Sequence, residues 1–343
     1  MLRRVFQHSI RRLHSKQLMY KEYGDPPKVI RLESFELSDK IPEGHVLVRW
    51  LAAPINPADL NQIQGVYPEK PASLPAVGGN DGYGVVEEVG CGVKALKVGD
   101  NVLRGLCPPG TWRTFGHHKA DDLYRIKGGL ELEAAATLQV NPPTAYRMLK
   151  DFVQLKPGDV VIQNGATSAV GRAVIQLAAA WGLKTVNIVR RRDDMEATVA
   201  DLKSLGADLV ITEEQLLKEY KKEVKNVALA LNCVGGRSTM FLTGTLRQGG
   251  VLVTYGGMSK QPLQIPTGPL IFKDIKLAGF WLTRWSKDRQ NDKEKDAMFS
   301  QLHELIQDGK LTPPKCETRS LEEAIDALEK ALTVFGGKQL FKM

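Results

Sequence analysis

The chain has 343 residues, of which 43% are hydrophobic, and a formal net charge of +8. This length exceeds the size at which a single hydrophobic core usually stops growing, so two domains are expected. The sequence contains no run of 18 consecutive apolar residues, which argues against a membrane-spanning helix.

The positive charge is concentrated at the N-terminus. Residues 1–16 contain four arginines, one lysine and no acidic residue, so most of the net charge lies there and not on a nucleic-acid-binding face. Apolar residues recur opposite these cations at helical spacing, a composition typical of a mitochondrial transit peptide. A frayed basic tail is the alternative. We therefore expect a transit peptide at 1–16, a mitochondrial matrix location and no nucleic-acid partner.

The potential metal ligands are scattered along the chain. The four cysteines form no C-x-x-C pair, which agrees with reduced thiols in a matrix compartment. His117 and His118 are adjacent, and neighbouring residues of a strand point to opposite faces of a sheet. We expect no metal site.

Residues 17–140 are rich in glycine, proline and short β-type segments, such as 45–55, 82–90 and 112–120. Short strands separated by turn residues predict an irregular, barrel-like β domain. The last part of the chain has a charged stretch after Trp285, two helices and a short strand, KQLFKM. We expect this part to return to the β domain, which would then comprise 17–140 and 284–343.

The segment 141–283 alternates predicted strands and helices. A helix with prolines at its head begins near Asn141, a buried strand follows at 157–165, and further strands and helices alternate up to KLAGFWLT. This alternation predicts a Rossmann domain, an α/β fold with a doubly wound, mostly parallel sheet and right-handed crossovers.

The first turn between strand and helix in this domain reads NGATSAVG, at 164–171. A dinucleotide pyrophosphate needs a tight turn and close backbone approach at a helix N-terminus, where free N–H groups favour anions. Gly165 and Gly171 supply the two ends of the turn, while Ala166 and Ala169 replace glycines of the strict motif. The segment predicts a dinucleotide site; a tight turn without a ligand is the alternative.

The end of the second strand discriminates between the two nicotinamide cofactors. An acid there binds the ribose hydroxyl of NAD, whereas arginines accept the 2′-phosphate of NADP. This chain has Arg190, Arg191 and Arg192, and the first acid comes only at Asp193. The pattern favours NADPH over a merely solvated cationic loop.

This arrangement resembles the medium-chain dehydrogenase/reductases: a β domain first, then a Rossmann domain entered through a TAY segment, then a return of the C-terminus. Zinc members of that family carry a G-H-E segment and four closely spaced cysteines. Here Asn80 and Asp81 occupy the positions of the histidine and the glutamate, and there is no cysteine cluster. Zinc chemistry is therefore disfavoured.

A narrower resemblance covers almost the whole chain. Segments such as NPADLNQIQGVYP, LQVNPPTAYRMLKDF and VTYGGMSKQP are similar to those of the mitochondrial trans-2-enoyl-thioester reductases, a zinc-free branch of this family. The resemblance implies a GroES-like β domain and a homodimer. It also implies NADPH-dependent reduction of the 2,3 double bond of an enoyl thioester, carried on acyl carrier protein or coenzyme A.

Tyr67 lies between Gly65 and Pro68, and a residue before proline prefers extended backbone, so a loop is expected there. A phenol of ordinary pKa, about 10, stays protonated near neutral pH and can donate a proton. The resemblance implies that Tyr67 is the catalytic proton donor. A tyrosine that only packs against the substrate is the alternative.

The resemblance also implies which residues bind the cofactor. Two of the groups follow predicted strands, and Trp281 could equally be a core residue. The pyrophosphate turn and the run of three arginines depart in detail from the family pattern. The implied residues are Asn141, Thr167, Ser168, Ala169, Val170, Arg190, Arg191, Arg192, Tyr255, Gly256, Gly257, Met258, Phe280, Trp281, Leu282, Thr283 and Lys338.

Two other functions stay open at this point. A quinone oxidoreductase of the same fold would reduce a quinone or an α,β-unsaturated ketone, and a non-catalytic protein would bind the cofactor without turnover. The sequence does not distinguish acyl carrier protein from coenzyme A. Arg284, Lys287 and Arg289 form a cationic run that could attract an acidic carrier.

Overall fold

A computed structural model describes residues 13–105, 110–289, 293–333 and 337–343. The chain divides into two compact units. The first unit comprises Met1–Gln139 together with Cys316–Met343, and the second comprises Val140–Lys315. In the part of the chain that is described, no helix is both long and apolar enough to cross a bilayer.

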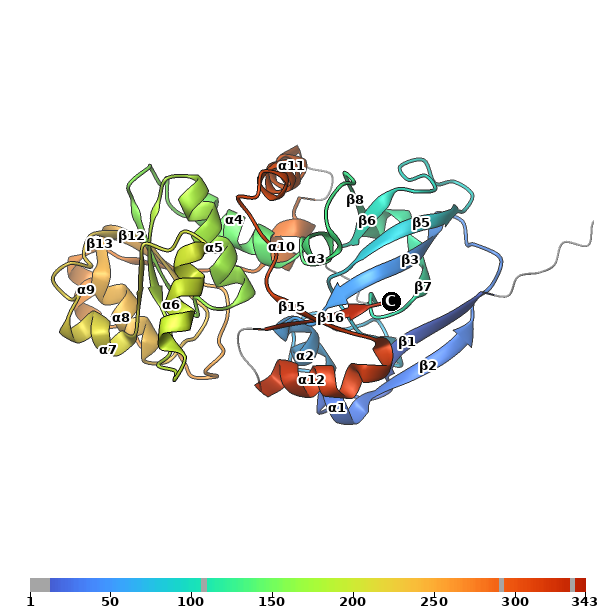
Figure 1. The fold of residues 1–343 in the computed structure, drawn as a ribbon, viewed down its shortest axis with the longest axis horizontal. Coiled ribbons are helices and arrows are strands. Elements are labelled where there is room, and N and C mark those ends of the chain that lie inside the picture. The colour runs from blue at the N-terminus through green and yellow to red at the C-terminus, as the bar shows by residue number, and fades with distance from the viewer. Residues whose placement is uncertain (1–12, 106–109, 290–292, 334–336) are drawn as a thin grey trace, which may run out of the picture. The chain divides into compact units, whose positions relative to one another are not determined.

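Two sheets form the first unit (Figure 1). A three-stranded sheet has the order β2-β1-β4, and a seven-stranded sheet has the order β15-β16-β3-β5-β6-β8, with β7 paired to β3. The pairing is mixed, and β3 and β5 shift register twice, which agrees with the predicted irregular β domain. The strands are β1 (His14–Tyr20), β2 (Ile30–Glu36), β3 (His45–Pro54), β4 (Ala76–Val77), β5 (Tyr83–Val89), β6 (Asn101–Arg104), β7 (Phe115–Lys119), β8 (Leu123–Ile126), β15 (Cys316–Arg319) and β16 (Lys338–Lys342).

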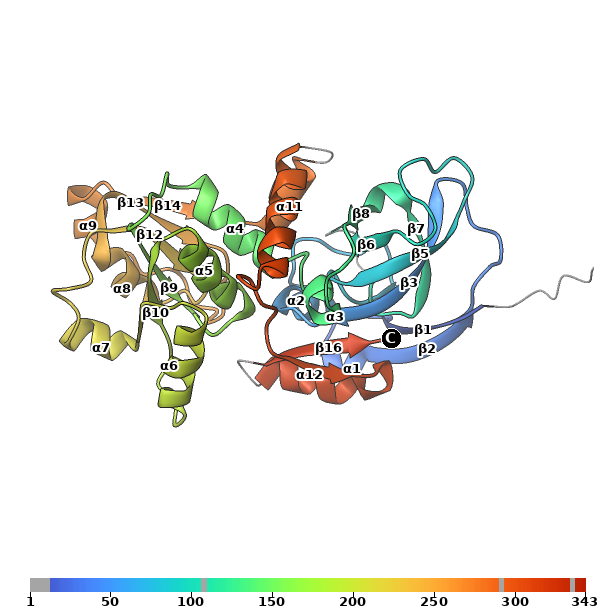
Figure 2. The ribbon, with the colours of Figure 1, turned by 45° about the horizontal axis from the view of Figure 1, so that its top comes forward.

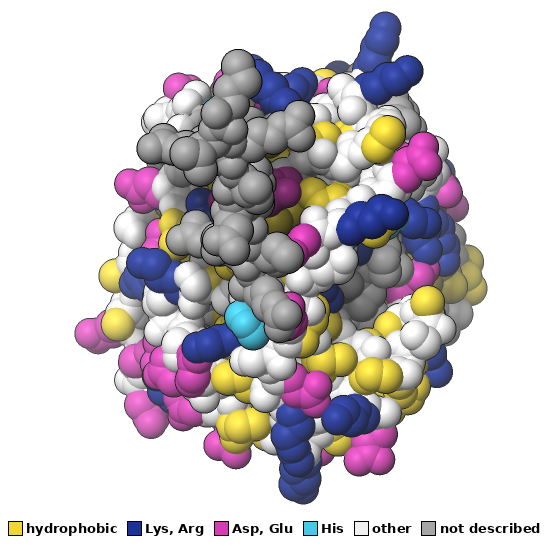
Figure 3. Space-filling model, turned by 90° about the vertical axis from the view of Figure 1, so that its right-hand side faces the viewer, with side chains coloured by type: hydrophobic (Ala, Val, Ile, Leu, Met, Phe, Trp, Pro, Cys, Tyr) yellow, Lys and Arg dark blue, Asp and Glu magenta, His cyan; other side chains and the backbone are white. Residues whose placement is uncertain are grey.

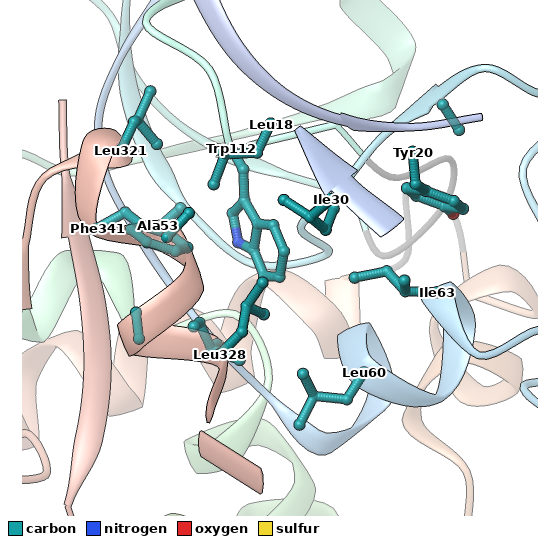
Figure 4. Packing of buried hydrophobic residues seen from close by; sticks show 14 residues of the cluster. Leu18, Tyr20, Ile30, Ala53, Leu60, Ile63, Trp112, Leu321, Leu328 and Phe341 are labelled. Atoms are coloured by element: carbon teal, nitrogen blue, oxygen red, sulfur yellow. The ribbon is translucent and has the colours of Figure 1, made fainter. Parts of the chain in front are cut away.

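Short helices connect these strands and cover their core. The core is centred on Trp112, which is fully buried and meets the ring of Phe341 edge to face at 5.3 Å between centroids. Figure 4 shows the indole between Phe341 and Ala53 on one side and Ile30 on the other. The helices are α1 (Pro26–Val29), α2 (Pro57–Ile63), α3 (Leu132–Ala136), α12 (Ala324–Thr333) and the 3₁₀ turns η1 (Ala120–Asp122) and η2 (Leu321–Glu323).

Strand β1 begins inside the expected transit peptide. His14, Ser15 and Lys16 belong to β1, and Ser15 is fully buried with its hydroxyl 2.7 Å from the carbonyl oxygen of Phe115. A leader that ended at residue 16 would remove the start of this strand, so that boundary is too late for the folded domain. Residues 1–12, which carry most of this prediction, lie outside the described residues.

The visible face of the space-filling view carries charges of both signs. Lys and Arg side chains are interspersed with Asp and Glu, and small apolar areas lie between them (Figure 3). Such a mixture is typical of a solvated protein surface.

The second unit is built on a parallel sheet of six strands in the order β11-β10-β9-β12-β13-β14. All of its strand pairs are parallel, and the order reverses beside β9. This confirms the predicted doubly wound sheet. The strands are β9 (Val160–Asn164), β10 (Lys184–Ile188), β11 (Leu209–Ile211), β12 (Val227–Asn232), β13 (Leu246–Thr254) and β14 (Lys276–Gly279).

Helices lie on both faces of this sheet, as Figures 1 and 2 show. One core joins Ile175 and Leu202 to the sheet, and the other joins Leu216 and Leu242 to its opposite face. The helices are α4 (Asn141–Asp151), α5 (Ala169–Ala180), α6 (Met195–Ser204), α7 (Glu213–Lys218), α8 (Ser238–Thr245), α9 (Thr267–Phe272), α10 (Leu282–Lys287) and α11 (Lys293–Gln307).

The structure differs from the expected domain boundary at 284. Residues 284–315, with most of α10 and all of α11, belong to the second unit, and the chain returns to the first unit at Cys316. Contacts between α11 and α4 explain this. The Tyr146 hydroxyl lies 2.7 Å from Oε1 of Gln301, and the Arg147 guanidinium pairs with Glu294.

The last helix before β13 is short. α8 ends at Thr245 and β13 starts at Leu246, because Leu246 already pairs with Val227 before a register shift in the ladder.

Candidate active site

The turn between β9 and α5 has the geometry of an anion site. Gly165 takes a left-handed conformation with φ of +63°, and Ser168 is the N-cap of α5. The Ser168 hydroxyl oxygen accepts a hydrogen bond from the amide of Gly171 at 3.1 Å. The remaining N-terminal amides of the helix and its dipole favour a negatively charged group beside Thr167, Ser168, Ala169 and Val170.

Close packing requires both glycines of this turn. A Cβ added at Gly165 would lie 2.4 Å from the sulfur of Cys233. A Cβ added at Gly171 would lie 2.7 Å from the carbonyl oxygen of Ala166. Ala166 itself is fully buried, so an alanine fits where the strict motif has glycine.

Two of the three arginines after β10 have different partners: Arg192 contacts Thr167, and Arg191 contacts Glu214. The Arg192 guanidinium reaches the hydroxyl of Thr167 in the pyrophosphate turn at 3.3 Å. Arg191 is exposed and lies 3.8 Å from the carboxylate of Glu214, and Arg190 is exposed. The structure therefore brings Arg192 together with the turn, and places the other two cations on the surface beside it.

A buried network of polar side chains joins the carboxyl ends of three strands. Nδ2 of Asn164 donates to Oδ1 of Asn232 at 2.8 Å and to the Ser238 hydroxyl at 3.0 Å. Nδ2 of Asn232 donates to the Thr254 hydroxyl at 3.1 Å, and the amide of Cys233 donates to Oδ1 of Asn164 at 2.8 Å. Sequence reasoning missed this network, although an asparagine that ends an otherwise apolar strand could have signalled it.

The segment Tyr255–Met258 follows β13 directly, as predicted. The amide of Met258 donates to the carbonyl of Cys233 at 2.9 Å, which fixes the loop, while the Met258 side chain is 53% exposed. Burial, and then the neighbouring Cys233, raise the pKa of the Tyr255 hydroxyl well above its usual value. The Tyr255 hydroxyl is therefore neutral and buried beneath the loop. Gly256, Gly257 and Met258 form the solvent-accessible part of the loop.

The segment Phe280–Thr283 follows β14. Leu282 and Thr283 are buried, so their side chains pack inside the second unit. Trp281 is partly exposed, with the Arg284 guanidinium 5.6 Å from its ring centroid. Phe280 contacts the ring of Phe152 edge to face.

Asn141 occupies the first turn of α4 and is buried. Like the predicted cofactor residues that follow β9, β10, β13 and β14, it belongs to the second unit.

Tyr67 belongs to the first unit and lies on a loop after α2, as predicted. Gly65 takes a φ of +76°, and the amides of Val66 and Tyr67 both donate to the carbonyl of Asn61, at 3.0 and 3.2 Å. The side chain of Tyr67 is partly exposed.

Lys338 also belongs to the first unit, where it lies in a buried polar cluster. Its ammonium donates to Oδ1 of Asn56, and burial lowers its pKa against the opposing effect of Asp81 and Asp59. Burial raises the pKa of Asp59 to about 6 and that of Asp81 to about 7. The sequence showed Asn80 and Asp81 only as a departure from the zinc pattern and did not reveal this cluster.

In the described ranges, no group of three or more His, Cys, Asp or Glu side chains is arranged to hold a metal ion.

Two family models match the chain. The alcohol dehydrogenase GroES-like domain matches residues 42–137, and the zinc-binding dehydrogenase domain matches residues 169–299. A curated relative, the mitochondrial enoyl-[acyl-carrier-protein] reductase of Caenorhabditis elegans, is 54% identical over 327 residues, which cover 95% of this chain and 94% of that protein.

Solved structures give the same result. The complex of Etr1p with NADP and crotonyl-CoA has a TM-score of 0.87 and 35% identity, and covers 96% of this chain and 100% of that one. The Etr1p/Etr2p heterodimer of Candida tropicalis, a mitochondrial 2-enoyl thioester reductase, has a TM-score of 0.87, 34% identity and the same coverage. With a GroES-like unit, a doubly wound unit and relatives at this identity over nearly its full length, the chain belongs to the mitochondrial enoyl-[acyl-carrier-protein] reductases of the medium-chain dehydrogenase/reductase superfamily.

Proposed function

We propose that this chain reduces the 2,3 double bond of trans-2-enoyl thioesters with NADPH, and that Tyr67 supplies the proton. The observation that carries the reaction class is the 54% identity to a mitochondrial enoyl-[acyl-carrier-protein] reductase over 95% of the chain. The similar Etr1p structure is a complex with NADP and crotonyl-CoA, a nicotinamide cofactor and an enoyl thioester.

The residues of the second unit fit NADPH. The N-terminus of α5 offers free amides to the pyrophosphate, and Arg192, held at Thr167, offers a cation beside it. Arg190 and Arg191 supply further charge for the 2′-phosphate. When bound, NADPH supplies a hydride from C4 of its nicotinamide to Cβ of the enoyl group.

In the first unit, Tyr67 would supply the proton that completes the reduction. Its phenol hydroxyl can donate a proton to Cα, or a hydrogen bond to the thioester oxygen while negative charge develops there. The Asn61 carbonyl fixes the backbone of the loop, so the phenol is presented by a defined turn. Lys338 is proposed as a further cofactor contact near the start of β16, and Asn141 as one near the nicotinamide.

The test compares the chain with its Tyr67→Phe variant, using NADPH oxidation with crotonyl-coenzyme A. We expect turnover to fall by roughly 10²- to 10⁴-fold, the usual contribution of a general acid, while NADPH affinity is retained. Near-normal turnover in the variant would exclude Tyr67 as the donor. A parent chain that reduced quinones but no enoyl thioester would instead support the quinone oxidoreductase.

The chain acts in mitochondria, as its relatives do, and we place it in the matrix. We further propose that acyl carrier protein presents the substrate. Arg284 and Lys287 are exposed cations on α10, close in sequence to Trp281, and an acidic carrier would be attracted to them. Arg284→Glu with Lys287→Glu should raise the KM for the carrier-bound substrate much more than that for the coenzyme A thioester. Equal changes would refute this surface.

We also propose a homodimer formed through β14. This strand ends the sheet of the second unit, so its outer edge has no neighbouring strand among the described residues. Next to it, α9 exposes Ile271 and Phe272, which are 63% and 83% accessible. An unpaired edge with apolar neighbours fits the same edge of a second copy. Phe272→Asp should yield monomers by light scattering, and an unchanged dimer would exclude this interface.

A further inference from the structure

A network of hydrogen-bonded, buried side chains connects the start of α2 to the far side of the Tyr67 loop. Asp59, Gln62 and Asn80 are 1%, 2% and 7% exposed. Oδ1 of Asp59 accepts from both the amide and Nδ2 of Asn80, at 2.8 and 2.7 Å. Its Oδ2 accepts from the amide of Asn56 at 2.7 Å. The carboxylate therefore locks the first turn of α2 to the segment that precedes β5.

Gln62 connects this network to the loop. Its Oε1 accepts from Nδ2 of Asn80 at 3.1 Å, and its Nε2 donates to the backbone carbonyl of Glu69 at 2.9 Å. Glu69 follows Tyr67 by two residues. Because the amide of Tyr67 is bonded to Asn61 on the near side, the loop is held at both ends, by backbone on one side and by Gln62 on the other.

Part of the loop is exposed to solvent. Gly65 has a positive φ, and Val66 is 71% exposed, so its apolar side chain contributes little packing. Segments with few buried apolar contacts open at low free-energy cost. The bond from Gln62 to Glu69 therefore ties the far side of a partly exposed loop to a buried side chain.

We propose that Gln62 is a positioning residue that holds the Tyr67 loop in its reactive geometry, with Asn80 and Asp59 fixing the Gln62 amide. The proposal rests on the assignment of Tyr67 as proton donor. The amide suits the position because it accepts from Asn80 and donates to Glu69 at the same time. A glutamate at 62 could accept but, when ionised, could not donate, and a hydrocarbon could do neither.

The test is Gln62→Met, which keeps the length of the side chain and removes both hydrogen bonds. Nδ2 of Asn80 keeps its bond to Asp59, so the change isolates the link to the loop. We expect kcat for crotonyl-coenzyme A to fall roughly 10-fold or more, since small misplacements of a reacting group carry costs of this order. The KM for NADPH should stay unchanged. Amide hydrogen exchange in 64–70 should accelerate, and exchange in β9 and α5 should not.

Gln64→Met is the matched control. Gln64 follows α2 directly and is partly exposed, and its side chain makes no hydrogen bond in the described part of the chain. It should leave kcat and loop exchange at parent values. If Gln62→Met proves insoluble, Gln62→Asn tests the same link, because its side chain is one methylene shorter and cannot span to Glu69.

A double-mutant cycle separates this proposal from the assignment beneath it. If Gln62 acts through Tyr67, then Gln62→Met should cause no further loss of kcat in a Tyr67→Phe background. An equal loss in both backgrounds, or unchanged exchange in 64–70, would overturn the proposal. Full turnover in Tyr67→Phe would refute the donor assignment instead, and the exchange data would still show whether Gln62 holds the loop.

Discussion

Gly165 gives the sharpest test of the cofactor turn, because two separate physical effects forbid a side chain there. Its φ of +63° costs an alanine roughly 1–2 kcal/mol. An added Cβ would also lie 2.4 Å from the sulfur of Cys233, and such overpacking typically costs about 1–3 kcal/mol. Gly165→Ala should therefore destabilise the turn by roughly 2–5 kcal/mol.

Gly249→Ala isolates the first effect. Gly249 has a φ of +68° and no heavy atom within 4 Å of an added Cβ, so it carries the backbone cost alone. It also lies outside the pyrophosphate turn. Cys233→Ala isolates the second effect, because it removes the sulfur that the new Cβ would meet.

The assay measures the Kd for NADPH from the fluorescence of the reduced nicotinamide. This Kd depends on the geometry of the turn, because the turn is the proposed pyrophosphate site. If about 1–3 kcal/mol of steric strain opposes the binding geometry, Gly165→Ala raises Kd about 5- to 150-fold. Gly249→Ala should leave Kd unchanged. Gly165→Ala made in the Cys233→Ala background should recover most of the affinity. Equal Kd values for the two glycine variants, or no recovery in the double variant, would refute the reasoning.

Three further outcomes are expected. Arg192→Ala should lower kcat/KM for NADPH roughly 10- to 100-fold and leave that for NADH unchanged, since a charge-assisted contact contributes about 1.5–3 kcal/mol; an unaltered cofactor preference would argue against its role. Trp112→Ala should destabilise the first unit by about 3–5 kcal/mol, seen as a lower thermal midpoint. The hydrogen bond from Arg172 helps to hold the pKa of Asp201 at about 2, below its usual 3.8, so Asp201 stabilises the fold above about pH 4 and less as the pH falls toward 2. Asp201→Asn should lower the midpoint at pH 7 more than at pH 3, and a pH-independent difference would contradict this.

Much of the second unit could be predicted from the sequence because its signals are local. Strand and helix alternate within segments of a few residues, and each element shows its own periodicity. The pyrophosphate turn is likewise local, because a glycine, a capping serine and a helix start lie within eight residues, 164–171. The arginines after β10 followed from their position at the end of a strand.

The boundaries needed tertiary contacts. Nothing local to residues 284–315 shows that α11 packs on α4 rather than returning to the β domain. Similarly, the basic composition of 1–16 concealed the start of β1, whose place depends on pairing with β2 and on burial of Ser15.

The sequence by itself determined the fold class, the family, the cofactor turn and the loop that carries Tyr67. Only the tertiary structure decided what supports these features. The sulfur of Cys233 lies against Gly165. Asp59 bonds to Asn80 and acts on the charge of Lys338, although Lys338 comes more than 250 positions later in the chain. A side-chain pattern reports the face that its own element buries, whereas contacts between distant segments depend on how whole elements pack, and no single segment encodes that packing.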